Sequence, residues 1–142
     1  MTIAAILGGQ SRDLISVTAD QSVRDAVALL AHKRIGAVPV MDGGQVVGVF
    51  SERDVIHALE AHGAAALDNT VGDEMTAPAI TVTPDEAALG ALSLMTKRRI
   101  RHLPVLEDGQ VIGIVSIGDL VKYRIDRIEA DAEAMRNYIQ SA

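Results

Sequence analysis

Cysteine is absent from this sequence of 142 residues, and aromatic side chains are almost absent. Without cysteine the chain forms no disulfide bond and no thiolate metal site, so it suits a reducing compartment. Two tyrosines and one phenylalanine are the only aromatic residues, so alanine, valine, isoleucine and leucine must build the core. The length is sufficient for one compact domain or for two very small ones.

The sequence also lacks a long apolar run and an excess of basic residues. No apolar stretch is long enough to cross a membrane, and the N-terminus does not have the basic start and apolar core of a signal peptide. The net charge is −6, whereas a general nucleic-acid binder needs a basic face and usually aromatic platforms. We therefore expect a soluble, cytoplasmic protein that binds neither membranes nor nucleic acids.

What the sequence does contain is one unit written twice. Residues 14–56 align without a gap on residues 79–121, and about a third of the aligned positions are identical. A match of this quality over a gapless block indicates an internal duplication. The identical pairs include Pro39/Pro104, Gly48/Gly113, Ser51/Ser116 and Asp54/Asp119.

Each copy predicts the same order of elements. A β-rich run at 15–18 precedes apolar residues at i, i+3, i+4 and i+7 from Val23 to Leu30, which predict an amphipathic helix. Two apolar runs, 37–41 and 45–50, flank a Gly-Gly turn and predict a hairpin. A second helix then begins at the conserved serine position of the repeat. The predicted fold is α/β, with two tandem β-α-β-β-α units.

Neither copy is large enough to bury its own sheet, so the two units are expected to pack against each other as a pseudo-two-fold pair. We divide the chain into a lead-in (1–13), a first unit (14–62), a linker (63–78), a second unit (79–125) and a C-terminal helical extension (126–142). The extension continues the last helix of the second unit, with apolar residues spaced by about 3.5 at Ile125, Ile128, Ala132, Met135 and Ile139. This stripe favours a contact between copies over a solvated tail helix.

The duplicated segments resemble the tandem cystathionine-β-synthase (CBS) domain pair, or Bateman module. The resemblance covers roughly residues 1–125 and depends on the segments AVPV and HLPV, the hairpins DGGQVVG and DGQVIG, and the junctions GVFSERD and GIVSIGD. It implies a stand-alone regulatory protein that is not an enzyme, that binds AMP, ADP or ATP between its halves, and that forms a homodimer through its helices. NAD(H) as the ligand, and a structural module with vestigial sites, remain open as alternatives.

The motif Ser-x-x-Asp at Ser51–Asp54 and Ser116–Asp119 has two interpretations. The serine and the aspartate are suited to cap the helix that follows them. They are also suited to a ligand, because a carboxylate accepts hydrogen bonds from a ribose diol and a helix N-terminus with a free hydroxyl suits a phosphate. Both roles are compatible, since a serine hydroxyl has one donor and two acceptor positions. The resemblance favours the ligand interpretation.

The resemblance also implies two crossed sites, in each of which the motif of one unit faces the strand entry of the other. The first, basic site would contain Ser51, Arg53, Asp54, Met75, Ala77, Ile100, Arg101, His102 and Pro104. The second would contain Gln10, Arg12, Ile35, Gly36, Ala37, Pro39, Ser116 and Asp119. The second site has fewer cations, so we expect it to bind phosphate more weakly.

Lys97, Arg98 and Arg99 end a helix, where cations suit the negative end of the helix dipole. We therefore interpret these three as helix-end charges and only Arg101 and His102 as ligand contacts. His32, His57 and His62 do not have the spacing of metal ligands. No nucleophile arrangement or long glycine-rich phosphate loop is present, so neither a metal site nor catalysis is expected.

Overall fold

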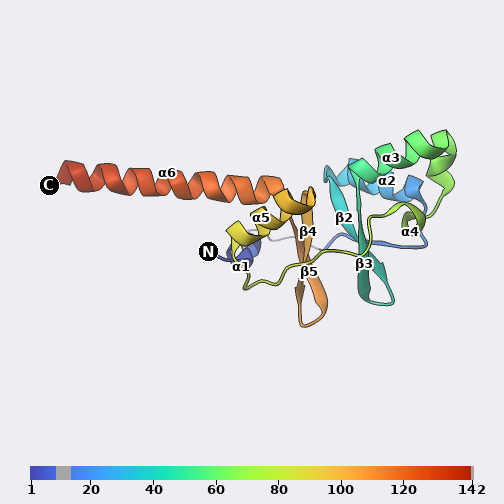
Figure 1. The fold of residues 1–142 in the computed structure, drawn as a ribbon, viewed down its shortest axis with the longest axis horizontal. Coiled ribbons are helices and arrows are strands. Elements are labelled where there is room, and N and C mark those ends of the chain that lie inside the picture. Colours follow the sequence, from blue (N-terminus) through green and yellow to red (C-terminus); the bar gives the residue numbers. More distant parts are fainter. Residues whose placement is uncertain (9–13, 142) are drawn as a thin grey trace.

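The computed structural model describes residues 1–8 and 14–141, which form two small α/β units and a long C-terminal helix (Figure 1). The first unit contains β1 (Val17–Thr18), α2 (Val23–Lys33), β2 (Ala37–Asp42), β3 (Gln45–Ser51) and α3 (Glu52–His62). The second contains α5 (Ala88–Arg98), β4 (His102–Glu107), β5 (Gln110–Ser116) and α6 (Ile117–Ser141). Three short helices complete the fold: α1 (Ile3–Gly8), the 3₁₀-helix η1 (Gly63–Asp68) and α4 (Val71–Glu74). The predicted α/β architecture is confirmed.

The two hairpins have the same register, which reflects the duplication. Strand β2 pairs antiparallel with β3, and β4 pairs in the same way with β5; each hairpin has one register shift, after Val40 and after Val105 respectively. Strand β1 runs parallel to β2. The predicted first strand of the second unit is reduced to a single bridge between Val82 and Val105. In the first unit the N–H of Ala19 continues the ladder by donating to the carbonyl oxygen of Met41, whereas the equivalent residue of the second unit, Pro84, has no N–H to donate.

Each unit has its own aliphatic core, and each core is completed by a short helix from outside the repeat. Val71 of α4 is buried with Val23, Val40 and the largest core side chain, Phe50, in the first unit. In the second unit, Ile3 and Ile6 of α1 are buried in the core around Leu103, Val105 and Met95. The segments that we assigned to a lead-in and a linker therefore contribute to the cores.

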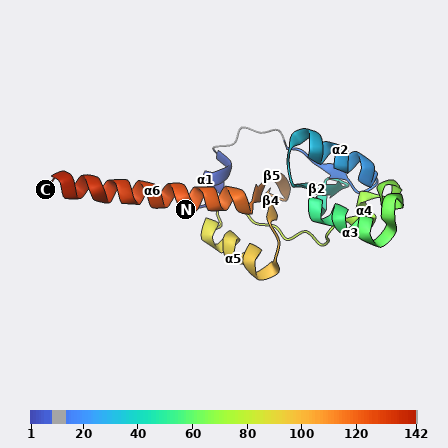
Figure 2. The same cartoon turned by 90° about the horizontal axis from the view of Figure 1, so that it is seen from above.

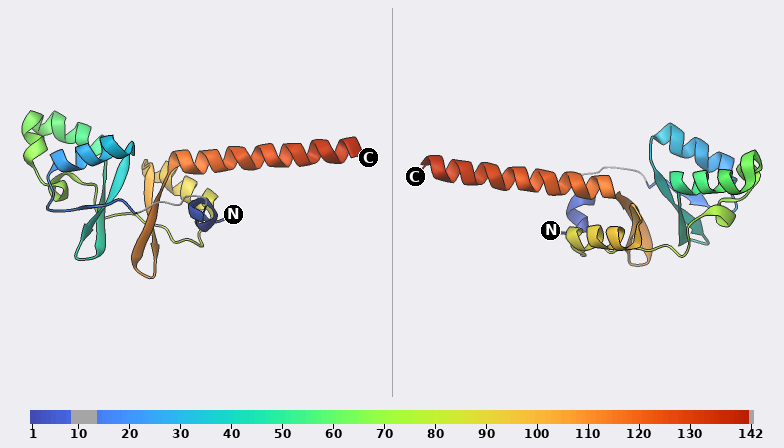
Figure 3. Two further views of the ribbon diagram at one scale, coloured as in Figure 1. Left: turned by 180° about the vertical axis from the view of Figure 1, so that it is seen from behind. Right: turned by 45° about the horizontal axis from the view of Figure 1, so that its top comes forward.

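The short helices are held by equivalent hydrogen bonds. The N–H of Ile3 donates to the carbonyl oxygen of Glu86 at 2.9 Å, and that of Val71 donates to the carbonyl oxygen of Gln21 at 2.8 Å. The helices of each unit cover the outer side of its sheet, so the two sheets lie side by side in the middle of the molecule (Figure 3). Pro39 and Pro104 alternate with core residues along β2 and β4, and their buried side chains therefore point away from the cores.

Gly48 permits a close approach of the segment after α4. The N–H and the carbonyl of Thr76 both pair with Val49 of β3, each at 3.0 Å. A Cβ atom at Gly48 would lie 2.7 Å from the Thr76 carbonyl oxygen and 2.7 Å from Met75 Sδ. At the equivalent Gly113, a Cβ atom would lie 3.1 Å from a side-chain methyl of Leu7, which can move.

We expect Gly48→Ala to destabilise the protein by about 1–3 kcal/mol, because the added methyl group overlaps a hydrogen-bonded backbone that cannot shift freely. Gly113→Ala, the matched control, should cost less than about 1 kcal/mol, because only a leucine rotamer must adjust. Urea denaturation of the two variants measures the difference. Equal losses of stability would show that the segment at residues 75–76 moves as easily as the Leu7 side chain.

Candidate functional site between the two units

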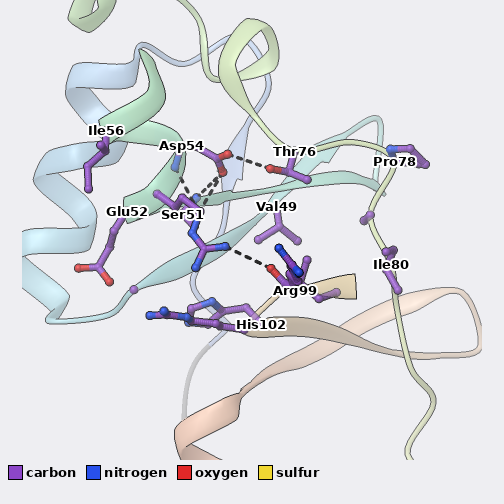
Figure 4. A pocket seen from close by; sticks show the side chains of 15 residues that line it. Val49, Ser51, Glu52, Asp54, Ile56, Thr76, Pro78, Ile80, Arg99 and His102 are labelled. Carbon is purple, nitrogen blue, oxygen red and sulfur yellow. Dashed lines mark hydrogen bonds between the residues drawn. The ribbon is translucent and has the colours of Figure 1, made fainter. Parts of the chain in front are cut away.

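A cavity of about 380 Å³ lies where the first unit's β3–α3 junction faces the second unit's entry into β4 (Figure 4). Ser51, Arg53 and Asp54 line it from the first unit, and Ile100–His102 line it from the second. The volume is within the range of roughly 300–1,000 Å³ that is usual for small-molecule sites. The cavity therefore brings together the Ser-x-x-Asp motif of one repeat and the strand entry of the other.

Asp54 is fixed by its neighbours and still faces the cavity. Its Oδ2 accepts from the backbone N–H of Ser51 at 2.9 Å and from Ser51 Oγ at 3.1 Å, and its Oδ1 accepts from Thr76 Oγ1 at 2.8 Å (Figure 4). Ser51 Oγ in turn accepts from the N–H of Asp54, which completes a capping box at the start of α3. Three of about four acceptor positions of the carboxylate are thus occupied. A ligand diol would be bound by both oxygens only if one protein hydroxyl turned away.

Backbone bonds between helix starts and strand entries position both sides of the cavity. The N–H of Glu52 donates to the carbonyl oxygen of Gly36 at 3.0 Å, and the N–H of Ile117 donates to that of Arg101 at 2.8 Å. The second bond fixes the backbone of Arg101 against the first turn of α6. Arg53 Nη1 crosses between the units and donates to the carbonyl oxygen of Arg99 at 3.2 Å (Figure 4).

The wall of the cavity is aliphatic on one side. Val49 comes from β3 and Ile100 from the entry into β4, while the segment after α4 contributes Thr76, Pro78 and Ile80. This segment is held against the edge of β3 by the Thr76–Val49 backbone pair. Such a wall fits a flat, weakly polar ring, and it is the only kind of wall that a chain with three aromatic residues supplies readily.

Cations outnumber acids around the cavity. Arg53, Arg99 and Arg101 are exposed at its lining, and Glu52 and Asp54 are the acids that face them. Guanidinium groups bind phosphate oxygens in pairs, so three of them in one cavity favour an anionic group. Glu52 and Asp54 would both oppose such a ligand, but the three hydrogen bonds that Asp54 accepts offset part of its charge.

His102 is half-buried, and burial lowers the pKa of its imidazole below the usual 6.5; the carboxylates of Glu52 and Asp119 oppose this shift. The imidazole of His102 is therefore harder to protonate than a solvent-exposed histidine. A phosphate beside it would favour the protonated form. His102 also lines the second cavity described below, as does Gly36.

A second cavity of about 290 Å³ occupies the pseudo-equivalent position. Ile35, Gly36 and Ala37 line it from the first unit, and Ser116 and Asp119 from the second. The N–H of Ser116 donates to Asp119 Oδ2 at 2.9 Å, and Ser116 Oγ accepts from the N–H of Asp119 at 3.1 Å, so the cap of α6 repeats that of α3. Among the described residues, Arg34 is the arginine at this cavity, against three at the larger one.

Four of the residues assigned to the sites from the sequence do not line either cavity. Pro39 and Pro104 are fully buried between the sheets. Met75 points to Gly48, and the cavity is reached instead by its neighbour Thr76, because side chains alternate along an extended segment. In the same way, Pro78 lines the cavity and its neighbour Ala77 does not. Gln10 and Arg12 lie outside the described residues.

Several residues that line the cavities were not assigned to a site from the sequence. Arg99 was interpreted as a helix-end charge, but it lines the larger cavity, as Arg34 lines the smaller one. The signal was available, because these two arginines are an identical pair in the duplication. Gly36, which was assigned to the second site, lines both cavities. No comparable signal marked the remaining residues of the larger cavity, which are Val49, Glu52, Ile56, Thr76, Pro78, Ala79 and Ile80.

The part of the chain that the structure describes contains no group of three or more His, Cys, Asp or Glu residues placed to hold a metal ion. None of its helices is both long enough and apolar enough to cross a membrane.

Comparison with known proteins identifies the architecture. The family model of the CBS domain matches residues 6–61 and again residues 71–126. The mitochondrial CBS domain-containing protein CBSX3 of Arabidopsis thaliana is 38% identical over 87% of this chain, which spans 62% of that protein. The crystal structure of the CBS-domain containing protein ATU1752 from Agrobacterium tumefaciens is 38% identical, with a TM-score of 0.82; 87% of this chain and 92% of that one are covered.

Two further similar structures contain ligands. The CBS domain protein PAE2072 from Pyrobaculum aerophilum, complexed with AMP, is 25% identical with a TM-score of 0.74; 84% of this chain and 89% of that one are covered. The CBS domain pair of protein MJ0100, in complex with 5′-methylthioadenosine and S-adenosyl-L-methionine, is 26% identical with a TM-score of 0.79. This match covers 89% of this chain and 98% of that one.

Proposed function

This chain belongs to the CBS-domain family, as a tandem pair, and on that basis we propose that it is a regulatory module that binds an adenine nucleotide in the cavity lined by Asp54 and Arg101. Adenosine is common to the ligands of the two similar complexes, AMP in one and methylthioadenosine or S-adenosylmethionine in the other. The aliphatic wall suits the adenine, and Asp54 suits the ribose diol.

The observation that supports a nucleotide over a sulfonium ligand is the set of three guanidinium groups. Arg53 and Arg99 are linked across the units by the 3.2 Å hydrogen bond, and Arg101 is fixed by its bond to the start of α6. Together they would attract a phosphate and repel the positive sulfur of S-adenosylmethionine. AMP, ADP and ATP all satisfy this requirement, and so does NAD(H).

We further propose that the ligand acts by shifting a conformational equilibrium and not by being converted. A nucleotide between the units would contact both of them at once, so its binding energy would favour the arrangement in which the units meet as they do here. The smaller cavity, with Arg34 as its arginine, is proposed to bind the same class of ligand more weakly. A structural module with vestigial sites is the alternative that experiment must exclude.

One sample of the purified chain is denatured, and any molecule that it releases is identified by mass spectrometry. The folded chain, free of that molecule, is then titrated calorimetrically with AMP, ATP, NAD⁺, adenosine and S-adenosylmethionine. We expect AMP or ATP to bind at least about tenfold more tightly than adenosine, since charged hydrogen bonds to phosphate are lost with the latter. Tighter binding of S-adenosylmethionine than of AMP would reject the nucleotide assignment. Absence of binding by all five compounds would leave the structural module as the better account.

A further inference from the structure

Helix α6 projects beyond the body of the molecule (Figure 2). It also exposes an apolar stripe. Val121, Ile125, Ile128, Met135 and Ile139 are 42%, 49%, 52%, 60% and 65% exposed. Of the twelve large hydrophobic side chains exposed among the described residues, these five and Tyr138 lie on this one helix. Helices in proteins gain most of their stability from packing of an apolar face. The exposed stripe therefore indicates a surface for a partner.

The stripe has the spacing of a coiled coil. Its members, with Ala132, follow one another at intervals of four, three, four, three and four residues, which is the heptad pattern of a and d positions. Ile125, Ala132 and Ile139 occupy a, and Val121, Ile128 and Met135 occupy d. The apolar residues of α6 that pack on the core of the second unit are Ile117, Leu120 and Tyr123, which fall at g, c and f. The body thus covers only the start of α6 and leaves the a and d side chains from Val121 to Ile139 exposed.

We propose that α6 forms a parallel, in-register, two-stranded coiled coil with α6 of a second copy of this chain. The flanking charges select this arrangement, because a g residue meets the e′ residue five positions further along the parallel partner. Arg124 (g) then faces Glu129 (e) of the second copy, and Asp131 (g) faces Arg136 (e), each pair occurring twice. In the single chain, Asp131 forms an exposed ion pair with Arg127 at 4.0 Å, and Arg136 forms one with Glu133 at 3.6 Å. Exposed ion pairs contribute little stability, so these two can be replaced by pairs with the second copy.

An antiparallel pair does not satisfy the same charges. If all six layers are kept, e faces e′ and g faces g′, so Glu129 meets its own copy, Asp131 meets its own copy, and Lys122 approaches Arg136. Shifting the antiparallel register by a heptad relieves this repulsion but loses two of the six apolar layers. This pairing does not depend on the nucleotide proposal, because Asp119 is the only described residue of α6 that lines either of the two cavities between the units.

Orientation is tested by cross-linking of the full chain, which has no native cysteine. Ile139→Cys places a thiol at the last a position; Ala130→Cys, the matched control, places one at an outer f position of the same helix. Under mild oxidation without nucleotide, Ile139→Cys should form a covalent dimer and Ala130→Cys should not. In the full-overlap antiparallel pair Ile139 would face Val121 of the other copy, about 27 Å from its own counterpart at 1.5 Å per residue. Equal cross-linking of both variants, or of neither, would overturn the proposal.

The charge pairs are tested by light scattering and sedimentation. Wild type should have twice the chain mass of 15.0 kDa. Glu129→Arg should raise the dimer dissociation constant by about tenfold or more, because two attractive pairs become repulsive. The double variant Arg124→Glu/Glu129→Arg should restore it. Asp126→Arg makes the same change of charge at the outer b position and should leave it nearly unchanged. A monomeric wild type, or a double variant as weak as Glu129→Arg, would contradict the proposal.

Discussion

Replacing Arg101 with alanine is expected to weaken AMP binding by roughly 10- to 150-fold, the effect of losing a charged hydrogen bond. The affinity for adenosine, which has the same base and ribose without phosphate, should change by less than about threefold. The reason is the position of the residue: its backbone is tied to the N–H of Ile117 at 2.8 Å, so its guanidinium is presented at the cavity beside Arg53 and Arg99. Titration calorimetry with both ligands measures the two effects.

Arg98→Ala is the matched control for this experiment. Arg98 ends α5 two positions before the cavity-lining Ile100, is exposed, and lines neither cavity. Its removal changes the net charge equally and should alter AMP affinity only slightly. Wild-type AMP binding should also weaken as salt rises, since the contact is ionic and partly exposed. If Arg101→Ala lowers adenosine and AMP affinity to the same extent, the arginine shapes the cavity and does not bind phosphate.

Residues 97–102 contain both features that the sequence predicts and one that it does not. The repeat was sufficient to predict the two units, their hairpins and the helix starts, because apolar periodicity and turn residues act locally. It did not predict that Arg99 reaches the cavity. Arg99 adopts a left-handed backbone conformation at the end of α5, with φ of 55°, as Arg34 does after α2 with φ of 54°. This turn carries the arginine out of the helical pattern on which the helix-end interpretation depended.

Met75, which the resemblance placed in the larger site, illustrates a different limit. The gapless alignment relates residues 65 apart, but the short helices outside it do not keep this spacing: Leu7 packs at Gly113 where Met75 packs at Gly48, a spacing of 68. The segment from Leu7 to the first repeat is therefore three residues longer than the segment from Met75 to the second repeat. Because the segment after α4 is extended, a wrong register exchanges the residues that face the cavity with those that face the core. Only the tertiary packing against Gly48 fixes that register.

Replacing Asp54 with asparagine is expected to weaken AMP binding by roughly 10- to 150-fold, because the carboxylate that would accept from the ribose diol loses its charge. Asparagine keeps one oxygen for the Ser51 cap and the shape of the side chain. The cap itself is the competing explanation, since Asp54 accepts from the Ser51 N–H at 2.9 Å and from Thr76 at 2.8 Å. Ser22→Ala separates the two: it removes a cap from α2, at 3.1 Å from the Asp25 N–H, away from the cavity-lining residues.

A thermodynamic cycle that combines the Asp54 substitution with a change in the ligand separates the ribose contact from the helix cap. AMP and 2′,3′-dideoxy-AMP are titrated into wild type and Asp54→Asn, so that the diol and its proposed acceptor are removed separately and together. If Asp54 binds the ribose, the substitution should weaken AMP strongly and dideoxy-AMP by less than about threefold. Ser22→Ala should lower the stability by about 1 kcal/mol, the usual cost of a lost cap, and leave both affinities unchanged. Equal weakening of AMP and dideoxy-AMP by Asp54→Asn would mean that Asp54 serves the helix alone, and that the ribose is held elsewhere in the cavity.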